Sequence, residues 1–286
     1  MQNTETSKLG GGLYLVSVPI GAARDITLRA LDILASADVL AAEDTRSMRR
    51  LMEIHGIALG DRPLVAYHDH NGDKMRPKLM QWLAEGKSVA YASEAGTPLV
   101  ADPGFDLARA ARGEGLNVIA APGASAVLTA LAVGGLPTDK FMFAGFLPNA
   151  SGQRKTAMAA LAAVPATLVF YESPKRVAAM LRDAAAVLGA DRQAALCREL
   201  TKKFEEVLRG TLSELAEQAG ERNLKGEMVV LIDRASLPSI NPDQLDQMLK
   251  DALANYSVRD AADVVATATG LPRRDIYQAA LRLSRD

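Results

Sequence analysis

Charged side chains follow an apolar run at residues 43–46, where the sequence reads "EDTR". The carboxylate of Glu43 or Asp44 is suited to accept a proton as a general base, and Arg46 is suited to bind an anion. Asp44 or Thr45 is equally suited to cap a following helix, which would leave Arg46 in solvent. The spacing alone leaves both interpretations open.

A second polar cluster, "YHDHN", occupies residues 67–71 after another apolar run. His68 and His70 are two apart, so we expect them on one face of a strand. A metal ion would need further ligands, and the chain has three histidines and one cysteine. We therefore favour hydrogen bonding to a substrate, or a histidine at the rim of a site, and predict no metal. Cys197 has no histidine nearby in the sequence to activate its thiol and is expected in the core.

Four turns are expected at the carboxyl ends of strands: "PIGAARD" (19–25), "EDTR" (43–46), "SEAGTPLVADPG" (93–104) and "APGAS" (121–125). In open α/β sheets, ligands bind where these ends converge. Three of the four turns hold glycine next to proline or alanine, which lets the backbone approach a ligand. The sequence has neither a P-loop nor a GxGxxG turn, so the ligand is expected to be small, flat and not strongly anionic. Any one of these turns alone would also be an ordinary connection.

Lysine and arginine gather at "RSMRR", "SGQRK", "FYESPKR" and "RELTKK". Local clusters of this kind can bind phosphate, and each is also common on a solvent-exposed face. The formal net charge is −1, so a polyanion would have to meet a local patch rather than the field of the whole protein.

The elements that position these residues alternate between strands and helices. Strand-like runs at "GLYLVSV", "DVLAAEDT", "KSVAYAS" and "LNVIAAPG" are continuously apolar, which is typical of a parallel sheet covered on both faces. The alternation begins again in the next part of the chain. We predict a disordered lead-in at 1–12, α/β domains with mainly parallel sheets at 13–122 and 123–235, and an all-helical tail domain at 242–286.

The composition is that of an ordinary globular protein, with 49% apolar and 23% charged residues among 286. The polar N-terminus lacks the apolar core of a secretory signal, and no stretch is long and apolar enough to cross a bilayer. A single cysteine excludes a disulfide within the chain. We expect a cytoplasmic protein without a membrane partner.

The motifs occur together in an order that resembles a known family. "YLVSVPIGAARDITLRAL", "AAEDTR", "SEAGTPLVADPG", "FYESPKR", "RELTKKFEE" and "KGEMVVLI" follow one another between residues 13 and 233. The set is similar to the tetrapyrrole methylase superfamily and, within it, to the ribosomal RNA small subunit methyltransferase I branch. The tail resembles the small helical domain of the same branch.

The resemblance implies two α/β domains flanking a cleft for S-adenosyl-L-methionine (SAM), and a homodimer. It also implies methyl transfer to the ribose 2′-hydroxyl of a cytidine in the decoding region of 16S rRNA, within the small ribosomal subunit. The implied cofactor contacts are Pro19, Gly21, Ala95, Gly96, Thr97, Pro98, Asp102, Pro122, Gly123, Ala124, Ser125, Ala126, Phe170, Tyr171, Gly226, Glu227 and Met228. The candidate RNA contacts are Arg46, Lys175, Arg176, Arg198, Lys202 and Lys203. Glu43 or Asp44 is the candidate base, and His68 is a lesser candidate.

The chain departs from the family pattern at two places. The family usually has Asn-Leu where this chain has Ala22-Ala23, and Asp where it has Glu94. The first change removes a polar amide beside the cleft, whereas the second retains a carboxylate, so we expect activity to survive.

Two other functions are compatible with the motifs. A relative that methylates a tetrapyrrole or another small molecule would need neither the basic clusters nor the helical tail. A non-catalytic RNA-binding protein would use the tail as a helix-turn-helix, but the tail mixes acidic and basic residues and makes a poor basic face.

Overall fold

The structure is a computed structural model that describes residues 8–100, 102, 104–235 and 241–284. The chain divides into two compact units. The first comprises Met1–Leu161 and Ala166–Asp233, and the second comprises Ala162–Pro165 and Arg234–Asp286. Part of the lead-in expected at 1–12 lies outside the described residues, and the first strand begins at its last residue, Gly12.

The first unit holds two sheets, and the N-terminal one is parallel throughout. Its strands are β1 (Gly12–Val16), β2 (Val39–Ala42), β3 (Leu64–Ala66), β4 (Ser88–Ala92) and β5 (Val118–Ala121), in the order β3-β2-β4-β1-β5. Every residue of β1, β2 and β4 is buried. This burial explains the continuously apolar runs, because both faces of the sheet are covered.

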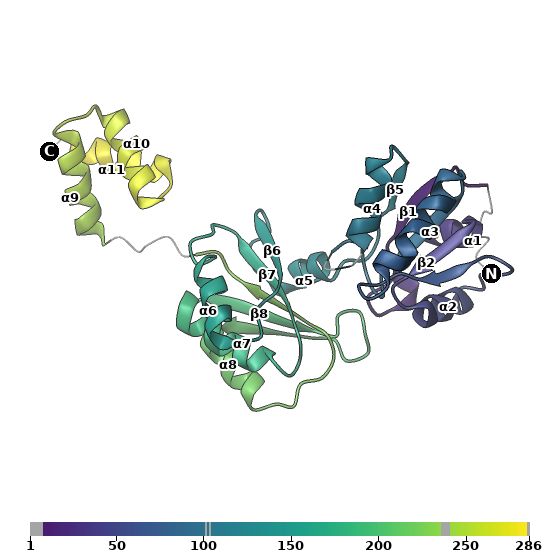
Figure 1. The fold of residues 1–286 in the computed structure, drawn as a ribbon. Coiled ribbons are helices and arrows are strands. Elements are labelled where there is room, and N and C mark those ends of the chain that lie inside the picture. The colour runs from purple at the N-terminus through teal and green to yellow at the C-terminus, as the bar shows by residue number, and fades with distance from the viewer. Residues whose placement is uncertain (1–7, 101, 103, 236–240, 285–286) are drawn as a thin grey trace. The chain divides into compact units, whose positions relative to one another are not determined.

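Helices cover the two faces of this sheet (Figure 1). They are α1 (Leu28–Ser36), α2 (Thr45–Ile54), α3 (Gly72–Ala84) and α4 (Gly104–Gly113), and a short 3-10 helix, η1 (Ala23–Asp25), precedes α1. Alternate residues of β1 face opposite layers: Tyr14 and Val16 pack in the cluster of α1 and α2, and Leu13 and Leu15 in that of α3 and α4. The period-2 alternation of a strand thus joins two hydrophobic cores in one sheet.

The strand order places a topological switch between β1 and β4. The chain leaves β1 toward β2, past β4, and leaves β4 toward β5, past β1, so the two connections run in opposite directions. Their helices, α1 and α4, lie on opposite faces of the sheet. A crevice outside the carboxyl ends of such strands is where open α/β sheets bind ligands. The loops that follow β1 and β4 are the predicted turns at 19–25 and 93–104.

The second sheet is mixed rather than mainly parallel. Its strands are β6 (Phe141–Phe146), β7 (Thr167–Glu172), β8 (Gln193–Arg198), β9 (Glu206–Thr211) and β10 (Met228–Ile232), in the order β6-β7-β10-β8-β9. β6 and β7 are parallel, whereas β10 runs antiparallel to β7 and β8, and β8 and β9 form a hairpin. The predicted fold class of two α/β domains is confirmed, and the expectation of parallel pairing holds for the first sheet alone.

The helices of the second sheet lie on opposite faces (Figure 1). α5 (Ala126–Gly134) packs on β8 and β10, and α6 (Ser151–Ala159), α7 (Val177–Leu188) and α8 (Leu212–Gly220) pack together on the other side. Gly134 allows α5 to approach the sheet, since a Cβ there would lie 2.2 Å from Leu231 Cδ1.

The second unit contains the helices α9 (Pro242–Leu253), α10 (Val258–Thr269) and α11 (Arg273–Leu283). Asn241 and Ser257 cap the first two helices, with each side chain accepting a hydrogen bond from a backbone N–H of the first turn. The helices enclose a small apolar cluster that includes Leu249, Val265 and Ile276. Across the described residues of both units, no helix has the length and apolar content that a membrane span requires.

Candidate functional site

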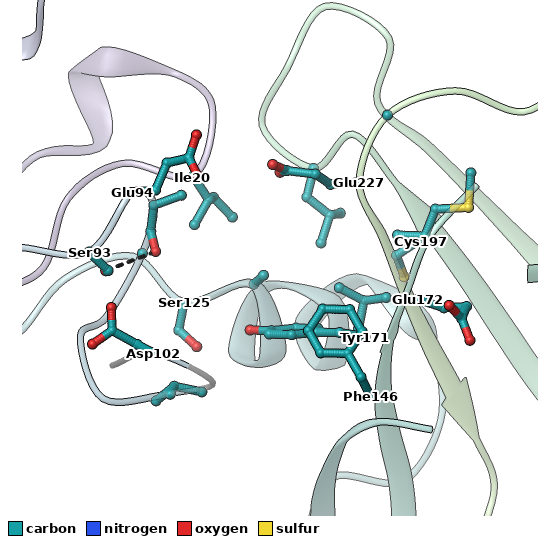
Figure 2. Close-up of a pocket in the computed structure, with 18 of the residues that line it drawn as sticks. Ile20, Ser93, Glu94, Asp102, Ser125, Phe146, Tyr171, Glu172, Cys197 and Glu227 are labelled. Atoms are coloured by element: carbon teal, nitrogen blue, oxygen red, sulfur yellow. Dashed lines mark hydrogen bonds between the residues drawn. The ribbon is translucent and has the colours of Figure 1, made fainter. Parts of the chain in front are cut away.

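A cavity of about 410 Å³ lies at the carboxyl ends of β1 and β4 and opens against the second sheet (Figure 2). One wall comes from the N-terminal half of the first unit (residues 12–125) and includes Ile20, Glu94 and Ser125. The facing wall comes from the C-terminal half of that unit (residues 126–161 and 166–232) and includes Tyr171 and Glu227. The volume falls in the range of about 300–1,000 Å³ that is usual for small-molecule sites.

The charge of this cavity has one sign. Among the described residues, its lining contains five carboxylates and no lysine, arginine or histidine. The five are Glu43, Glu94, Asp102, Glu172 and Glu227. A cavity of this kind favours a cationic ligand over an anionic one.

Three of the four predicted turns are tied together at the cavity. Val18 and Gly96 form an isolated antiparallel bridge, in which Val18 N donates to Gly96 O at 3.0 Å and Gly96 N donates to Val18 O at 3.1 Å. Thr97 Oγ1 donates to Ala124 O at 2.9 Å and lies 3.3 Å from Ser17 Oγ. Through Ser17, Val18, Gly96, Thr97 and Ala124, the segments that follow β1, β4 and β5 are therefore held together at one wall of the cavity.

Asp102 anchors the turn that follows β4. Its Oδ1 accepts from Gly104 N at 2.7 Å, Tyr91 Oη at 3.0 Å and Leu99 N at 3.2 Å. Burial raises the pKa of Asp102 above its usual value, because the hydrogen bonds only partly offset the loss of water. Leu99 is held at φ 70, a left-handed conformation that a leucine seldom adopts. Asp102 thus stabilises the turn and also lines the cavity.

Glu43 is the charged residue of "EDTR" that faces the cavity. It follows β2 directly, and its Oε2 accepts a hydrogen bond from Glu94 N at 3.0 Å. Burial is the main reason that the pKa of Glu43 is raised, and the nearby Asp102, Glu94 and Asp69 raise it further. A carboxylate with a raised pKa at a cavity wall is suited to general base chemistry.

Asp44 has the capping role that the sequence left open. Its Oδ1 accepts from the backbone N–H groups of Arg46 and Ser47 at the start of α2, and its side chain also accepts from the Arg46 guanidinium. These hydrogen bonds lower the pKa of Asp44 to about 2. Asp44 lines a neighbouring groove instead of the cavity, and Arg46 lies in the same groove with its side chain 90% exposed.

His68 lies in a turn, so its predicted place on a strand is wrong. β3 ends at Ala66, two residues earlier, and Asn71 closes the turn by accepting from His68 N at 2.9 Å. The rings of His68 and His70 are 6.0 Å apart, and neither lines the cavity. The described residues include no group of three or more side chains placed to hold a metal ion.

The structure brings together ten of the predicted cofactor residues. The cavity is lined by Ala95, Gly96, Thr97, Asp102, Ser125, Ala126, Tyr171, Gly226, Glu227 and Met228. Pro19 and Gly21 line the neighbouring groove, which shares Ser93 and Glu94 with the cavity. Pro98, Pro122, Gly123, Ala124 and Phe170 line neither hollow. Phe170 is fully buried, since it alternates along β7 with Tyr171.

Several lining residues were not singled out as cofactor contacts from the sequence. Phe146 is 59% exposed at the end of β6, and its ring meets the Tyr171 ring edge-on with centroids 5.6 Å apart. Cys197 is buried as predicted and lines the cavity floor, where burial raises its pKa to about 11. Ile20 packs in the same apolar cluster as Cys197 and Leu200, a contact between distant segments that no local pattern signals.

The candidate RNA contacts differ in how far other groups neutralise them. Arg176 binds Glu172 and the carbonyl of Leu147. Arg198 binds Glu206, and Lys202 Nζ binds the carboxylates of Glu199 and Glu227. Lys175 and Lys203 are exposed, and Lys203 lies over the ring of Phe204, itself 62% exposed.

The chain is similar to known proteins over nearly its whole length. Residues 12–216 match the family of Tetrapyrrole (Corrin/Porphyrin) Methylases, and residues 239–284 match the RsmI C-terminal HTH domain. Curated relatives named "Ribosomal RNA small subunit methyltransferase I" include one from Mesorhizobium japonicum, 47% identical over 95% of this chain and 92% of the relative. Another, from Halalkalibacterium halodurans, is 42% identical over 93% of each chain.

A solved structure shares the fold at low sequence identity. Uroporphyrin-III C-methyl transferase from Thermus thermophilus, complexed with S-adenyl homocysteine, is similar with a TM-score of 0.56 and 20% identity. The similarity covers 79% of this chain and 98% of that one.

Proposed function

Since the chain belongs to the tetrapyrrole methylase family and, within it, to the ribosomal RNA small subunit methyltransferases I, we propose that it methylates 16S rRNA with SAM as cofactor. The acceptor in this proposal is the ribose 2′-hydroxyl of a cytidine in the decoding region. The cavity between the two sheets is the proposed cofactor site, and the groove beside it is the side from which RNA approaches.

The observation that carries this proposal is the charge of the cavity. SAM carries a positive sulfonium, and the described lining offers five carboxylates with no cationic side chain. Arg176 and Lys202 bind two of them, Glu172 and Glu227, and the other three, Glu43, Glu94 and Asp102, come from the N-terminal half. The lining also suits the nucleoside part of the cofactor, because small residues such as Gly96 and Ala126 let the backbone approach it closely. The Tyr171 and Phe146 rings supply flat apolar surface for a base.

The chain's own residues position the acceptor and take its proton. Bound SAM supplies an electrophilic methyl carbon next to a sulfur that leaves as a neutral thioether. Glu43 is proposed to accept the proton of the 2′-hydroxyl as its oxygen attacks, since this carboxylate lies at the cavity wall. Holding the oxygen in line with the methyl carbon contributes most of the remaining rate enhancement.

We propose that the partner is the small ribosomal subunit rather than free RNA. The exposed cations Arg46, Lys175 and Lys203 can bind phosphates locally, which suits a protein with a net charge of −1. A cytoplasmic location follows from this substrate. We also infer a homodimer from the family, and the exposed Phe141 and Met142 on edge strand β6 offer apolar surface for a second copy.

Methyl-labelled SAM tests the proposal. We expect label in the ribose of one cytidine when the protein is incubated with small ribosomal subunits, and none with tetrapyrrole precursors. Label in a tetrapyrrole would instead assign a small-molecule methyltransferase. If calorimetry detects RNA binding but no SAM binding, the protein acts without catalysis and the proposal is wrong.

A further inference from the structure

The loop between β8 and β9, residues 199–205, is held in an unusual backbone conformation. Glu199 has φ 50 and Thr201 has φ 64, both in the left-handed region. This region is unfavourable for a β-branched residue and persists where surrounding contacts stabilise it. The contacts of these two residues therefore indicate what the loop is built to hold.

Glu199 fixes one wall of the cavity. Its backbone N donates to Glu227 O at 2.9 Å, and its Oε1 accepts from Glu227 N at 3.0 Å. The same oxygen accepts from Lys202 Nζ at 2.8 Å. Gly226 makes this close approach feasible, because a Cβ there would lie 2.3 Å from Glu199 Cδ. Gly226 and Glu227 line the cavity, so Glu199 determines where that wall lies.

Thr201 joins this wall to the N-terminal half of the unit. Ala22 N donates a hydrogen bond to Thr201 Oγ1 at 3.1 Å, between residues 179 positions apart in the sequence. The loop also packs tightly on Gly21, where a Cβ would lie 2.5 Å from Lys202 Cγ and 2.6 Å from Thr201 Oγ1. Ala22 needs only its backbone for this contact, so the missing amide side chain at this position does not prevent it.

The contact lies directly beside the cavity. Ile20 and Leu200, the neighbours of Gly21 and Thr201, line the cavity from opposite halves and pack in one apolar cluster. A change in the separation of these two loops therefore changes the width of the cavity.

We propose that residues 199–205 form a clasp that sets the separation of the two halves for cofactor binding, with Glu199 and Thr201 as positioning residues. The proposal rests on the proposed function for the identity of the cofactor. Lys202 belongs to this clasp, since its ammonium group is bound between Glu199 and Glu227, and it serves the cofactor site in preference to RNA.

Thr201→Val and Thr201→Ser test the clasp as a matched pair. Valine keeps the β-branch and removes the hydroxyl acceptor, whereas serine keeps the acceptor. We expect SAM to bind the valine variant roughly 2- to 10-fold more weakly by calorimetry, as the loss of one hydrogen bond implies, and the serine variant to bind like the parent protein. The KM for SAM should rise in the valine variant while the KM for ribosomal subunits stays constant.

Gly21→Ala tests the same contact from the other half. The added methyl group should separate the loops and weaken SAM binding, whereas Gly152→Ala is a matched control because nothing lies within 4 Å of that position. If the parent protein binds SAM and the valine variant binds it with equal affinity, the clasp is refuted and the proposed function is not. Parent protein that does not bind SAM would instead refute the proposed function.

Discussion

Glu43 Oε2 accepts a hydrogen bond from the backbone N–H of Glu94, with 3.0 Å between the two atoms. This contact joins the ends of β2 and β4, which are neighbouring parallel strands. It holds the Glu43 carboxylate at the wall of the cavity, next to the turn that Asp102 anchors. The contact also separates Glu43 from its neighbour Asp44, whose carboxylate caps α2.

Glu43→Gln should lower the rate of methyl transfer by about 10²- to 10⁴-fold, the usual contribution of a general base. Glutamine retains an oxygen that can accept from Glu94 N, so SAM affinity and folding should persist. Single-turnover rates with small ribosomal subunits, measured alongside calorimetric SAM binding, check this. A variant with the parent rate would remove Glu43 from the mechanism.

The pH dependence has a defined sign for the same residue. A base acts when deprotonated, so the rate of the parent protein should rise with pH as Glu43 ionises, at a pKa raised above the ordinary 4.5 by burial. A raised pKa means that folding favours the protonated form of Glu43. Protonation of Glu43 therefore stabilises the folded state at low pH, and this stabilisation is lost as pH rises through the raised pKa. Glu43→Gln should therefore abolish the acid limb of the rate profile without lowering the melting temperature at pH 7.

Asp44→Ala should reduce stability, and Asp44→Ser should reduce it less, because serine can also cap α2 but cannot bind the Arg46 guanidinium as a carboxylate does. The pKa of Asp44 is lowered from 3.8 to about 2, so its contribution to stability is present above pH 3.8 and is lost as pH falls toward 2. Thermal unfolding of the parent and both variants at pH 7 and pH 2 measures this. Methyl transfer per folded molecule should be equal in all three proteins, and a selective loss in both variants would instead give Asp44 a chemical role.

The strands of the first sheet could be predicted because each of β1, β2 and β4 is buried on both faces and reads as an unbroken apolar run. β9 was not predicted. Its sequence, "EVLRGT", contains charged residues. The loop before it turns through Glu199 and Thr201 in left-handed conformations, where a sequence usually marks the turn with glycine. The second sheet therefore appeared more parallel than it is, since a hairpin partner of β8 was missing from the pattern.

The site shows the same division between local and distant contacts. The glycine-rich turns marked the cavity wall because their composition reflects close backbone approach. The state of the charged residues was not predictable, because their partners are distant in the sequence. Lys202 is bound by Glu227, and Arg176 donates to the carbonyl of Leu147. Spacing could not separate Glu43 from Asp44 either, since capping depends on the start of α2.

Lys203→Ala and Phe204→Ala should weaken binding to small ribosomal subunits and leave SAM affinity unchanged. Lys203 lies 5.5 Å from the centre of the exposed Phe204 ring, and a cation beside an exposed aromatic ring suits a phosphate next to an unstacked base. The slope of log K for binding against log salt concentration should become less steep by about one unit in Lys203→Ala, because one phosphate contact is lost. Lys78→Ala is a matched control, since Lys78 also lies over an aromatic ring, Trp82, and does not line the cavity. Equal effects of the two lysine variants would contradict a specific contact.

Gly134→Ala should destabilise the first unit by about 1–3 kcal/mol, the usual cost of overpacking a core. A Cβ at this position would lie 2.2 Å from Leu231 Cδ1, where α5 rests on β10, and the sheet cannot move without disturbing its other strands. Leu231→Val removes the clashing methyl group, so the double variant should recover part of the loss and show a favourable coupling energy in urea unfolding.

Gly152→Ala, in an exposed part of α6, should be neutral or stabilising. Because α5 begins with Ala126 at the cavity, Gly134→Ala should also weaken SAM binding. If the free energies of unfolding lost in the two single variants simply add in the double variant, the contact between residue 134 and Leu231 is not the cause of the loss.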